Sequence, residues 1–385
     1  MIPYGKQSIS RADIAAVREV LKSDFITQGP KVPEFENKVK TFVGSKYAFA
    51  MNSATSSLHI ACLALGLKEG DYLWTSSNSF VASANCGIYC GAKVDFVDID
   101  PTSYNMDMIQ LNNKLQEAKK NNCLPRIVIP VHMAGQSCDM ETLKKLSKQY
   151  GFSIIEDASH GIGSKYKNKY VGSCKYSDIT VFSFHPVKII TTGEGGVATT
   201  NNKELAKKIN ILRTHGITKD KKEMLNDSHG PWYFEQHELG FNYRMTDIHA
   251  SLGINQMQRL RSFVNKRNTL AKNYDRLLEN MPLKIPVQSK DCSSSFHLYI
   301  VRINMNKIKS NKKKIFNYLK KKGIGVNVHY IPIHYHPFYQ NLNFKKGYLP
   351  ETEKYYEEAI SLPIFPDLKL KDQKYIANCL KEVLK

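Results

Sequence analysis

One lysine lies in a segment whose residue types suit nucleophilic chemistry. Lys188 stands within SFHPVKIITTGEGG, residues 183–196, after a predicted buried strand and before two threonines and a glycine-rich turn. A lysine that forms an imine needs rigid backbone, partial removal from water to lower its pKa, and room beside it for a flat ring. Three closely spaced glycines would let backbone approach such a ring. The alternative is a surface lysine beside a glycine-rich turn, and this is the better interpretation for the segment taken alone.

A carboxylate follows an apolar run in IIEDASH, residues 154–160. Asp157 should end a central strand, where its carboxylate could face the ring nitrogen of a pyridoxal cofactor and keep that nitrogen protonated. The alternative is an Asp that caps the next helix or turn, and the segment alone favours neither role. His160 is placed to contact the same ring or its phenolic oxygen, although a single His is more often structural.

Two further segments follow strand-like runs and offer contacts for a phosphate and a ring. In MNSATSS, residues 51–57, small and hydroxyl residues begin a helix, so free amides and the positive end of the helix dipole could meet a phosphate. An ordinary Ser or Thr helix cap is the alternative. In TSSNSF, residues 75–80, Phe80 could stack on a flat ring, although most aromatics at such positions belong to the core. The order of the four segments, each after a successive strand, predicts one pyridoxal-phosphate site.

Alternating strand-like and helix-like segments must position these residues. Short apolar runs predict strands at Tyr47–Met51, Tyr72–Trp74, Val94–Val97, Arg126–Val131, Ser153–Ile155 and Ile179–Phe182. Helical periodicity predicts helices at Thr55–Leu65, Val81–Tyr89, Met106–Lys119, Met140–Tyr150 and Lys203–Leu212. Repeated strand–helix order predicts an α/β fold with a mostly parallel sheet covered on both faces, and binding residues at the carboxyl ends of its strands.

The second part of the chain has a different pattern. Residues 220–239 lose the periodicity and predict a loop that packs elsewhere, and a long helix is expected from Met245 to Glu279. A small α+β domain should follow, with strand-like segments at Phe296–Ile303 and Gly325–His329. The prediction is therefore a large cofactor-binding domain over residues 1–250 and a small C-terminal domain over residues 251–385.

Composition argues against several other classes of protein. The eight cysteines are scattered without paired CxxC spacing, which predicts reduced thiols in a cytoplasmic protein. No apolar stretch reaches the roughly 18 residues of a membrane-spanning helix, and the first residues do not have the pattern of an export signal.

The net charge of +20 is the one unusual bulk property. Because 45 of the 55 positive residues are Lys, whereas nucleic-acid recognition favours Arg, no nucleic-acid partner is expected. The densest basic run, residues 307–323, carries Ile315, Phe316 and Leu319 at helical spacing, which predicts an amphipathic helix with a solvated basic face.

The quoted segments resemble the DegT/DnrJ/EryC1/StrS family of sugar aminotransferases over nearly the whole chain. The resemblance implies fold-type I of the pyridoxal-phosphate enzymes, the aspartate aminotransferase-like class. It implies that Lys188 forms the Schiff base, that Asp157 pairs with the pyridine nitrogen, and that His160 lies near the ring's O3′. Phe80 would stack on the ring. The residues implied for the phosphate are Ala54, Thr55 and Ser183, together with Asn242 supplied by the second subunit of a homodimer.

Within the family, the likeness is greatest to the branch that makes the pseudaminic-acid precursor. It is carried by NSAT, DASH, SFHPVK, LRTHG and GIGVNVHY. Enzymes of that branch transfer the amino group of L-glutamate to C4 of a UDP-linked 4-keto-6-deoxy-N-acetylhexosamine. His329 and Tyr330 are then the expected substrate contacts. After Tyr330 the sequence IPIHYHPFY departs from the branch, and its extra histidines are expected to form a packed or substrate-facing cluster rather than a metal site.

Other functions remain open from sequence. The enzyme could act on another nucleotide-linked keto sugar, carrying dTDP or GDP, or at C3 of the sugar. The resemblance also implies that the family contains dehydratases, which lack this lysine and usually carry His in its place, so the presence of Lys188 favours transamination. A non-catalytic binding protein on the same scaffold is the alternative from another class, and the presence of both Lys188 and Asp157 argues against it.

Overall fold

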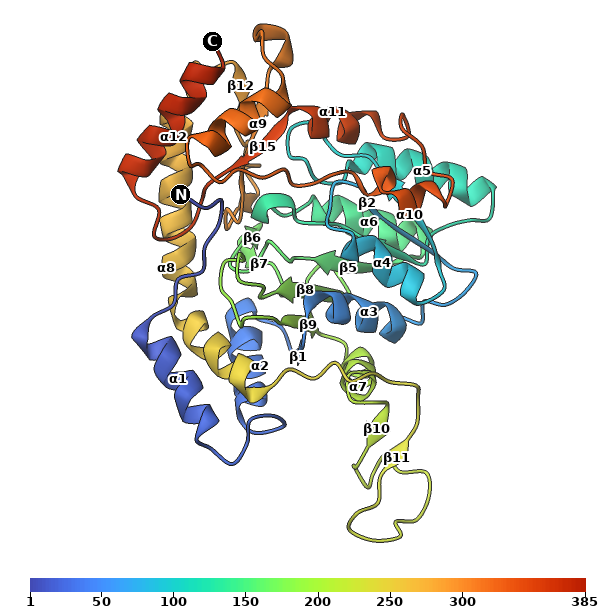
Figure 1. Ribbon diagram of the computed structural model, residues 1–385. Helices are drawn as coiled ribbons and strands as arrows, with labels where there is room; N and C mark the ends of the chain where they lie inside the picture. The colour runs from blue at the N-terminus through green and yellow to red at the C-terminus, as the bar shows by residue number, and fades with distance from the viewer.

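The computed structural model describes all residues from 1 to 385 and has a seven-stranded sheet at its centre (Figure 1). The strand order is β1-β9-β8-β5-β4-β2-β3. The strands are β1 Tyr47–Met51, β2 Tyr72–Ser76, β3 Lys93–Val97, β4 Ile127–Ile129, β5 Ser153–Asp157, β8 Ile179–Ser183 and β9 Gly196–Thr200. Strand β9 pairs antiparallel with both β1 and β8, and the other pairings are parallel. The sheet is therefore mostly parallel, as predicted, and β9 is the strand that the alternating pattern did not predict.

Helices cover both faces of this sheet, so successive residues of one strand pack in different hydrophobic clusters. On β5, Ile154 packs in a cluster with residues of α5 and α6, whereas Ile155 packs in a cluster with residues of α3, α4 and α7. The helices around the sheet are α2 Lys31–Val43, α3 Ala54–Ala64, α4 Ala82–Tyr89, α5 Met108–Lys120, α6 Met140–Tyr150 and α7 Lys203–Leu212. Side chains on the two sides of a strand alternate, so near-continuous apolar runs are what a sheet buried on both faces requires.

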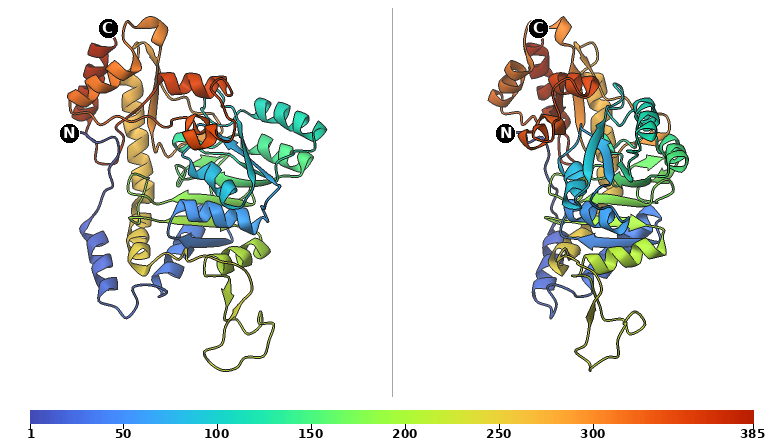
Figure 2. Two further views of the ribbon diagram at one scale, coloured as in Figure 1. Left: turned by 45° about the vertical axis from the view of Figure 1, so that its right-hand side comes forward. Right: turned by 90° about the vertical axis from the view of Figure 1, so that its right-hand side faces the viewer.

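The second part of the chain is built around a separate core. Helix α8, Asp247–Leu277, packs on α1, Arg11–Leu21, and on α2 near its start, and on α12, Leu370–Val383, further along (Figures 1 and 2). A three-stranded antiparallel sheet accompanies it, made of β12 Leu283–Lys284, β14 Tyr299–Ile303 and β15 Ala359–Leu362. The remaining elements of this part are β13 Cys292–Ser293, the 3-10 turns Met305–Lys307 and Ile333–Tyr335, α9 Lys312–Lys321, α10 Pro337–Gln340 and α11 Pro350–Glu358.

The predicted division at residue 250 falls inside the first turn of α8 and remains a prediction. The first residues of the chain contact the second part, because the Ile2 amide donates to the Gly323 carbonyl (2.8 Å) and the Gly325 amide donates to the Ile2 carbonyl (2.7 Å). The strand expected at Gly325–His329 does not form. Residue 325 pairs with the N-terminal segment and Asn327 makes a single bridge to Ser361, so no continuous ladder exists.

The basic run forms the amphipathic helix that its spacing predicts. Helix α9 buries Ile315 and Leu319, half-buries Phe316 and leaves most of its lysines exposed. None of the helices has the length and apolar character needed to cross a membrane.

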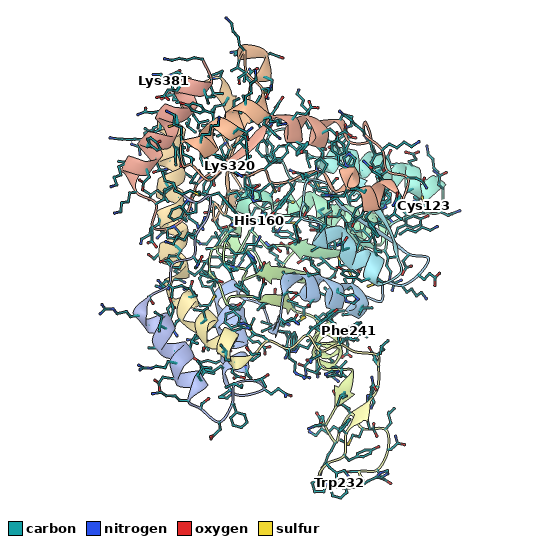
Figure 3. All side chains as sticks on the ribbon, viewed as in Figure 1. Cys123, His160, Trp232, Phe241, Lys320 and Lys381 are labelled. Atoms are coloured by element: carbon teal, nitrogen blue, oxygen red, sulfur yellow. The ribbon has the colours of Figure 1, made fainter.

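The segment 220–239 projects from the body of the protein between two short strands, β10 Ile217–Thr218 and β11 Glu235–Gln236 (Figures 1 and 2). Trp232 lies near its far end (Figure 3) and, like Leu225, is largely exposed. The Glu235 carboxylate accepts hydrogen bonds from the Leu225 and Asn226 amides (2.7 and 2.8 Å), so the projecting segment has internal order.

Two further short strands, β6 Lys165–Tyr166 and β7 Lys169–Tyr170, form a small sheet with β13.

Candidate active site

A cavity of about 770 Å³ lies at the carboxyl ends of the central strands and brings most of the predicted site residues together. The predicted residues that line it are Ala54, Thr55, Phe80, Asp157, His160, Ser183, Lys188, His329 and Tyr330. A second cavity, of about 790 Å³, lies beside Trp74 and Lys114 and holds none of them. Its lysine is already paired, because Lys114 Nζ lies 2.8 Å from the Asp95 carboxylate.

Lys188 lies on the loop between β8 and β9 and has a free amino group in the cavity. The loop is held by backbone hydrogen bonds from Lys188 to His185 (2.9 Å) and from Thr192 to Phe184 (3.0 Å). The Nζ atom has no hydrogen-bond or ion-pair partner in the chain. Burial lowers the pKa of Lys188 to about 8, against the attraction of the Asp157 carboxylate, which raises it. The alternative of a solvated surface lysine is therefore wrong for Lys188. A pKa near neutrality makes the unprotonated amine available as a nucleophile and base.

Asp157 is the last residue of β5, the middle strand of the sheet, and is 4% exposed. One carboxylate oxygen accepts a hydrogen bond from Ser83 Oγ at 2.6 Å, and the other accepts one from the Ser159 amide at 3.0 Å. Asp157 therefore stabilises the following turn and also lines the cavity, so the turn contact does not exclude the predicted contact with a ring nitrogen. Ser83, on the first turn of α4, was missed from sequence because a single hydroxyl three residues after Phe80 carries no distinctive signal.

The neighbouring carboxylate, Glu156, points to the opposite side of β5. Its oxygens accept hydrogen bonds from Ser177 and Thr180, and one lies 2.7 Å from Nε2 of the buried His132. Burial raises the pKa of Glu156, but the hydrogen bonds and the attraction of His132 outweigh it and leave the pKa below its ordinary value of 4.5. This network fixes the strand that carries Asp157.

We expect Glu156→Gln to destabilise the protein at pH 7 by about 1–3 kcal/mol, the range for a buried hydrogen bond to a charged group. Because the folded-state pKa of Glu156 is lowered, its stabilisation is present above the unfolded pKa and is lost as the pH falls below about 4.5. The difference in unfolding free energy between wild type and variant should therefore shrink with acidification, as measured by urea denaturation from pH 7 to pH 4. The exposed Glu117→Gln is the matched control, and a pH-independent difference would contradict the assignment.

The start of α3 has the features of a phosphate site. The Ala54 and Thr55 amides have no hydrogen-bond acceptor within the chain, and both residues line the cavity. The Ser53 hydroxyl accepts the Ser56 amide at 3.1 Å, so the ordinary helix cap is also present, one residue earlier. The Ser183 hydroxyl, across the cavity, makes no hydrogen bond in the chain. Free amides at the positive end of a helix, with a free hydroxyl, suit a phosphate group.

The glycine-rich turn also serves the packing of the strand that follows it. A Cβ placed on Gly196 would lie 2.5 Å from the Ala54 amide nitrogen, so this glycine lets β9 pass close to the start of α3. Gly193 has a φ of +84°, which L side chains rarely adopt. At Gly196 the absence of a side chain is needed by the backbone of the predicted phosphate site, and the interpretation in which the glycines admit a ring stays a prediction.

Aromatic and imidazole rings form another wall of the cavity. Phe80 is 59% exposed and its ring centroid lies 6.3 Å from that of Tyr330, so one face is free to stack on a flat ligand. His160 is buried, and its Nε2 lies 2.9 Å from the Tyr330 hydroxyl. Burial, with a smaller contribution from the charge of Lys188, holds the pKa of His160 well below its usual range, so the ring is neutral. Its Nδ1 is buried without a partner.

One of the two histidines after Tyr330, His334, is structural. His334 is fully buried; its Nδ1 lies 2.7 Å from the Ser77 hydroxyl and its Nε2 lies 3.0 Å from the Glu353 carboxylate. No group of three or more His, Cys, Asp or Glu side chains is arranged to hold a metal ion. The packed interpretation of this segment is therefore confirmed for His334, which ties the loop before Phe80 to α11. His329 lines the cavity, where burial lowers its pKa to about 3, and its Nδ1 lies 2.8 Å from the Ser361 hydroxyl.

Asn242 does not line the cavity of its own chain. It is exposed, and its backbone pairs with Thr214. Phe241, its neighbour in sequence, lies beside α7 and away from His160 (Figure 3). The predicted role of Asn242 requires a second subunit and remains a prediction. The cavity residues that were not predicted from sequence include Tyr4, His297 and Asn327. Tyr4 and His297 belong to none of the quoted motifs, whereas Asn327 lies in GIGVNVHY, of which only His329 and Tyr330 were predicted as contacts.

The donor set fits a flat, phosphorylated, aldehyde-bearing cofactor. Free amides and a hydroxyl suit the phosphate, an aromatic with a free face suits the ring, and a buried carboxylate suits a cationic ring nitrogen. The amine that would react with the aldehyde is free in the same cavity.

Comparison with known proteins gives the same answer over the whole chain. The profile of the DegT/DnrJ/EryC1/StrS aminotransferase family matches residues 7–381. A UDP-4-amino-4,6-dideoxy-N-acetyl-beta-L-altrosamine transaminase of Campylobacter jejuni is 39% identical, covering 100% of this chain and 98% of that protein. Among solved structures, Helicobacter pylori PseC, an aminotransferase involved in the biosynthesis of pseudoaminic acid, has a TM-score of 0.90 at 33% identity, covering 100% of this chain and 99% of that one.

The PLP-form of the putative sugar aminotransferase Spr1654 from Streptococcus pneumoniae has a TM-score of 0.89 at 29% identity and covers both chains fully. These likenesses extend through the sheet, the lysine loop and the second part of the chain, and they confirm the aspartate aminotransferase-like fold of type I. With a free lysine and a buried aspartate meeting in one cavity of such a fold, the chain belongs to the DegT/DnrJ/EryC1/StrS aminotransferase family.

Proposed function

We propose that this protein is a pyridoxal-phosphate-dependent aminotransferase that moves the amino group of L-glutamate to C4 of a UDP-linked 4-keto-6-deoxy-N-acetylhexosamine. The observation that carries the proposal is the free, pKa-lowered amine of Lys188 in the same cavity as the buried Asp157 carboxylate. The names of the C. jejuni relative and of PseC support the UDP-sugar and the place of the product in pseudaminic-acid synthesis.

Each residue has a distinct task in this proposal. When bound, pyridoxal phosphate supplies an aldehyde that takes up the amino group and a ring that accepts an electron pair. The Ala54 and Thr55 amides and the Ser183 hydroxyl hold its phosphate, and Phe80 stacks on its ring. The Asp157 carboxylate keeps the ring nitrogen protonated, while Ser83 holds that carboxylate in place. His160 contacts the phenolic oxygen, and His329 and Tyr330 contact the sugar substrate.

Lys188 has two tasks, one after the other. As a nucleophile, its amine would hold the aldehyde of the cofactor covalently in the resting enzyme. As a base, the Nζ would remove a proton from the substrate carbon that bears the nitrogen, and it would later return a proton at the sugar's C4. A pKa of about 8 suits both directions, because the amine can lose or gain the proton near neutral pH.

The proposal includes a homodimer in which Asn242 reaches the phosphate of the other subunit. The projecting segment carries the exposed Leu225 and Trp232, which offer apolar surface that a second subunit would cover. The division into a large domain of residues 1–250 and a small one of residues 251–385 belongs to the same proposal. Since all eight cysteines are free thiols, a cytoplasmic location fits the chain.

The proposal is tested by adding pyridoxal phosphate to the cofactor-free protein. We expect an absorbance band of lysine-bound cofactor, and borohydride followed by peptide mapping should place the cofactor on Lys188. Because the neutral amine is the reactive form, the rate of uptake should rise with pH up to about 8 and level off above it. Lys203→Ala, an exposed lysine, is the control. Absence of the band, or label on another lysine, would contradict the proposal.

The substrate is tested separately with glutamate and a panel of 4-keto and 3-keto sugars linked to UDP, dTDP or GDP. Mass spectrometry should detect conversion of the ketone to an amine on the UDP-linked 4-keto sugar first. Preference for a dTDP- or GDP-linked sugar would contradict the proposed substrate but would still support the proposed amino-group transfer. Binding of sugars without any turnover would favour a non-catalytic protein.

A further inference from the structure

His297 is a buried histidine in the cavity wall with no partner for its ring. It is 3% exposed, precedes β14, and lines the cavity, and its ring centroid lies 4.4 Å from that of His160. Neither ring nitrogen is hydrogen-bonded to any group of the chain, and Nδ1 is buried. Buried polar groups are nearly always hydrogen-bonded, so this ring needs an explanation.

The backbone of His297 is held on both sides. Its amide donates to the Ala134 carbonyl (2.9 Å), and its carbonyl accepts a hydrogen bond from Nη1 of the fully buried Arg267 (3.1 Å). The same Nη1 also binds the carbonyls of Phe296 (3.1 Å) and Ile364 (3.0 Å). A ring on backbone fixed in this way is preorganised, which is how binding groups gain affinity without an ordering cost.

The protonation of this ring follows from its surroundings. Burial, and then the neighbouring basic groups, of which Lys188 and Arg267 carry positive charge, hold the pKa of His297 well below its usual range, so the imidazole is neutral. A neutral imidazole has one N–H and one acceptor nitrogen. A buried N–H without an acceptor is rarer in proteins than an unsatisfied acceptor. Since Nδ1 is buried without a partner, the hydrogen belongs on Nε2, which then acts as a donor.

The cavity offers few other groups for an anion at this depth. No arginine lines it, and its single lysine, Lys188, is committed to the chemistry. An amino-acid donor carries its α-carboxylate on the reacting carbon itself, whereas a nucleotide-sugar carries its negative charges on a diphosphate several bonds away. In the first half-reaction, with the amino acid bound, a hydrogen-bond donor of the protein beside the reacting carbon therefore meets a full negative charge. In the second half-reaction, with the nucleotide-sugar bound, it meets only neutral oxygens.

We infer that His297 donates a hydrogen bond from Nε2 to the α-carboxylate of the amino donor. The inference rests on the proposed function, and it makes His297 selective for one of the two substrates that use the cavity in turn. Hydrogen bonds to charged groups are the stronger ones, and loss of one corresponds to about a 10- to 100-fold weaker interaction.

The test separates the two half-reactions by stopped-flow absorbance, using His297→Leu, which removes the donor, and His297→Gln, which keeps an N–H. His297→Leu should raise the glutamate concentration for half-maximal rate about 10- to 100-fold and change the sugar half-reaction less than about threefold. His297→Gln should recover most of the loss. The matched control is His336→Gln, because His336 lies outside the cavity.

Binding without turnover gives a second measurement. Calorimetry with glutarate, an unreactive dicarboxylate, should show the same order of affinity, with wild type and His297→Gln above His297→Leu. Equal losses in both half-reactions, a loss confined to the sugar, no loss, or no recovery with Gln would each overturn the inference. If wild type with cofactor fails to take an amino group from glutamate, the proposed function fails instead, which is a different result.

Discussion

Lys188→Ala is expected to lower kcat/KM for transamination by about 10⁴-fold or more, because it removes both the nucleophile and the proton carrier. Its side chain has no hydrogen-bond partner in the chain, so the loss should not come from unfolding. The variant should still bind pyridoxal phosphate, since the amides of α3 and the Ser183 hydroxyl are unchanged. Single-turnover mixing with glutamate measures the step directly.

The contrast with other lysines makes this result specific. Lys203→Ala changes an exposed side chain on α7 and should keep full activity. Bound cofactor in Lys188→Ala should no longer be fixed by borohydride. Retention of more than about one-tenth of wild-type activity would show that another group performs the proton transfer and would remove the basis of the proposed function.

Asp157→Asn is expected to lower kcat by about 10²- to 10³-fold, the range for loss of one preorganised electrostatic contact in an active site. The amide keeps the size of the side chain but cannot hold a proton on the ring nitrogen, so the ring becomes a weaker electron sink. Affinity for glutamate should change little, which distinguishes this variant from His297→Leu. Steady-state kinetics at saturating glutamate and sugar measures the fall in kcat.

A graded companion to this variant is Ser83→Ala. It leaves the carboxylate in place but removes the hydrogen bond of 2.6 Å that orients it, so its effect on kcat should have the same sign and be about tenfold or less. Asp157→Asn with unchanged kcat would show that the carboxylate serves only the turn at Ser159.

The sequence was sufficient for those parts of the fold that depend on local pattern. β1 and α6 have the predicted bounds, and α3, α4 and β5 differ by one or two residues, because buried strands and amphipathic helices have clear periodicity. Strand β9 was missed because it follows the lysine loop directly and pairs antiparallel, without an intervening helix. Residues 325–329 have strand-like composition, but their neighbours in space offer no continuous edge to pair with.

The site could be predicted wherever a residue belongs to a motif beside a strand end. Lys188, Asp157 and Phe80 all lie where strand order placed them, around one cavity. His297, Tyr4 and Ser83 could not be found in this way. Their roles depend on contacts between segments more than 100 residues apart, or on a single hydroxyl bond to a carboxylate, and neither leaves a local pattern. Asn242 shows a different limit, because the contact predicted for it requires a second subunit and a single chain does not test it.

Helix α8 bears on how the active-site cavity can admit two substrates of very different size. It runs unbroken for 31 residues, roughly 46 Å at 1.5 Å per residue, and serves as a packing surface for both parts of the chain. A hinge motion between those two parts would require consecutive backbone hydrogen bonds of α8 to break. We therefore expect the active-site cavity to keep its width through the catalytic cycle. Glutamate and the nucleotide-sugar should be accommodated by rotamer changes at its rim, above all at the exposed Phe80 and the half-buried Tyr4.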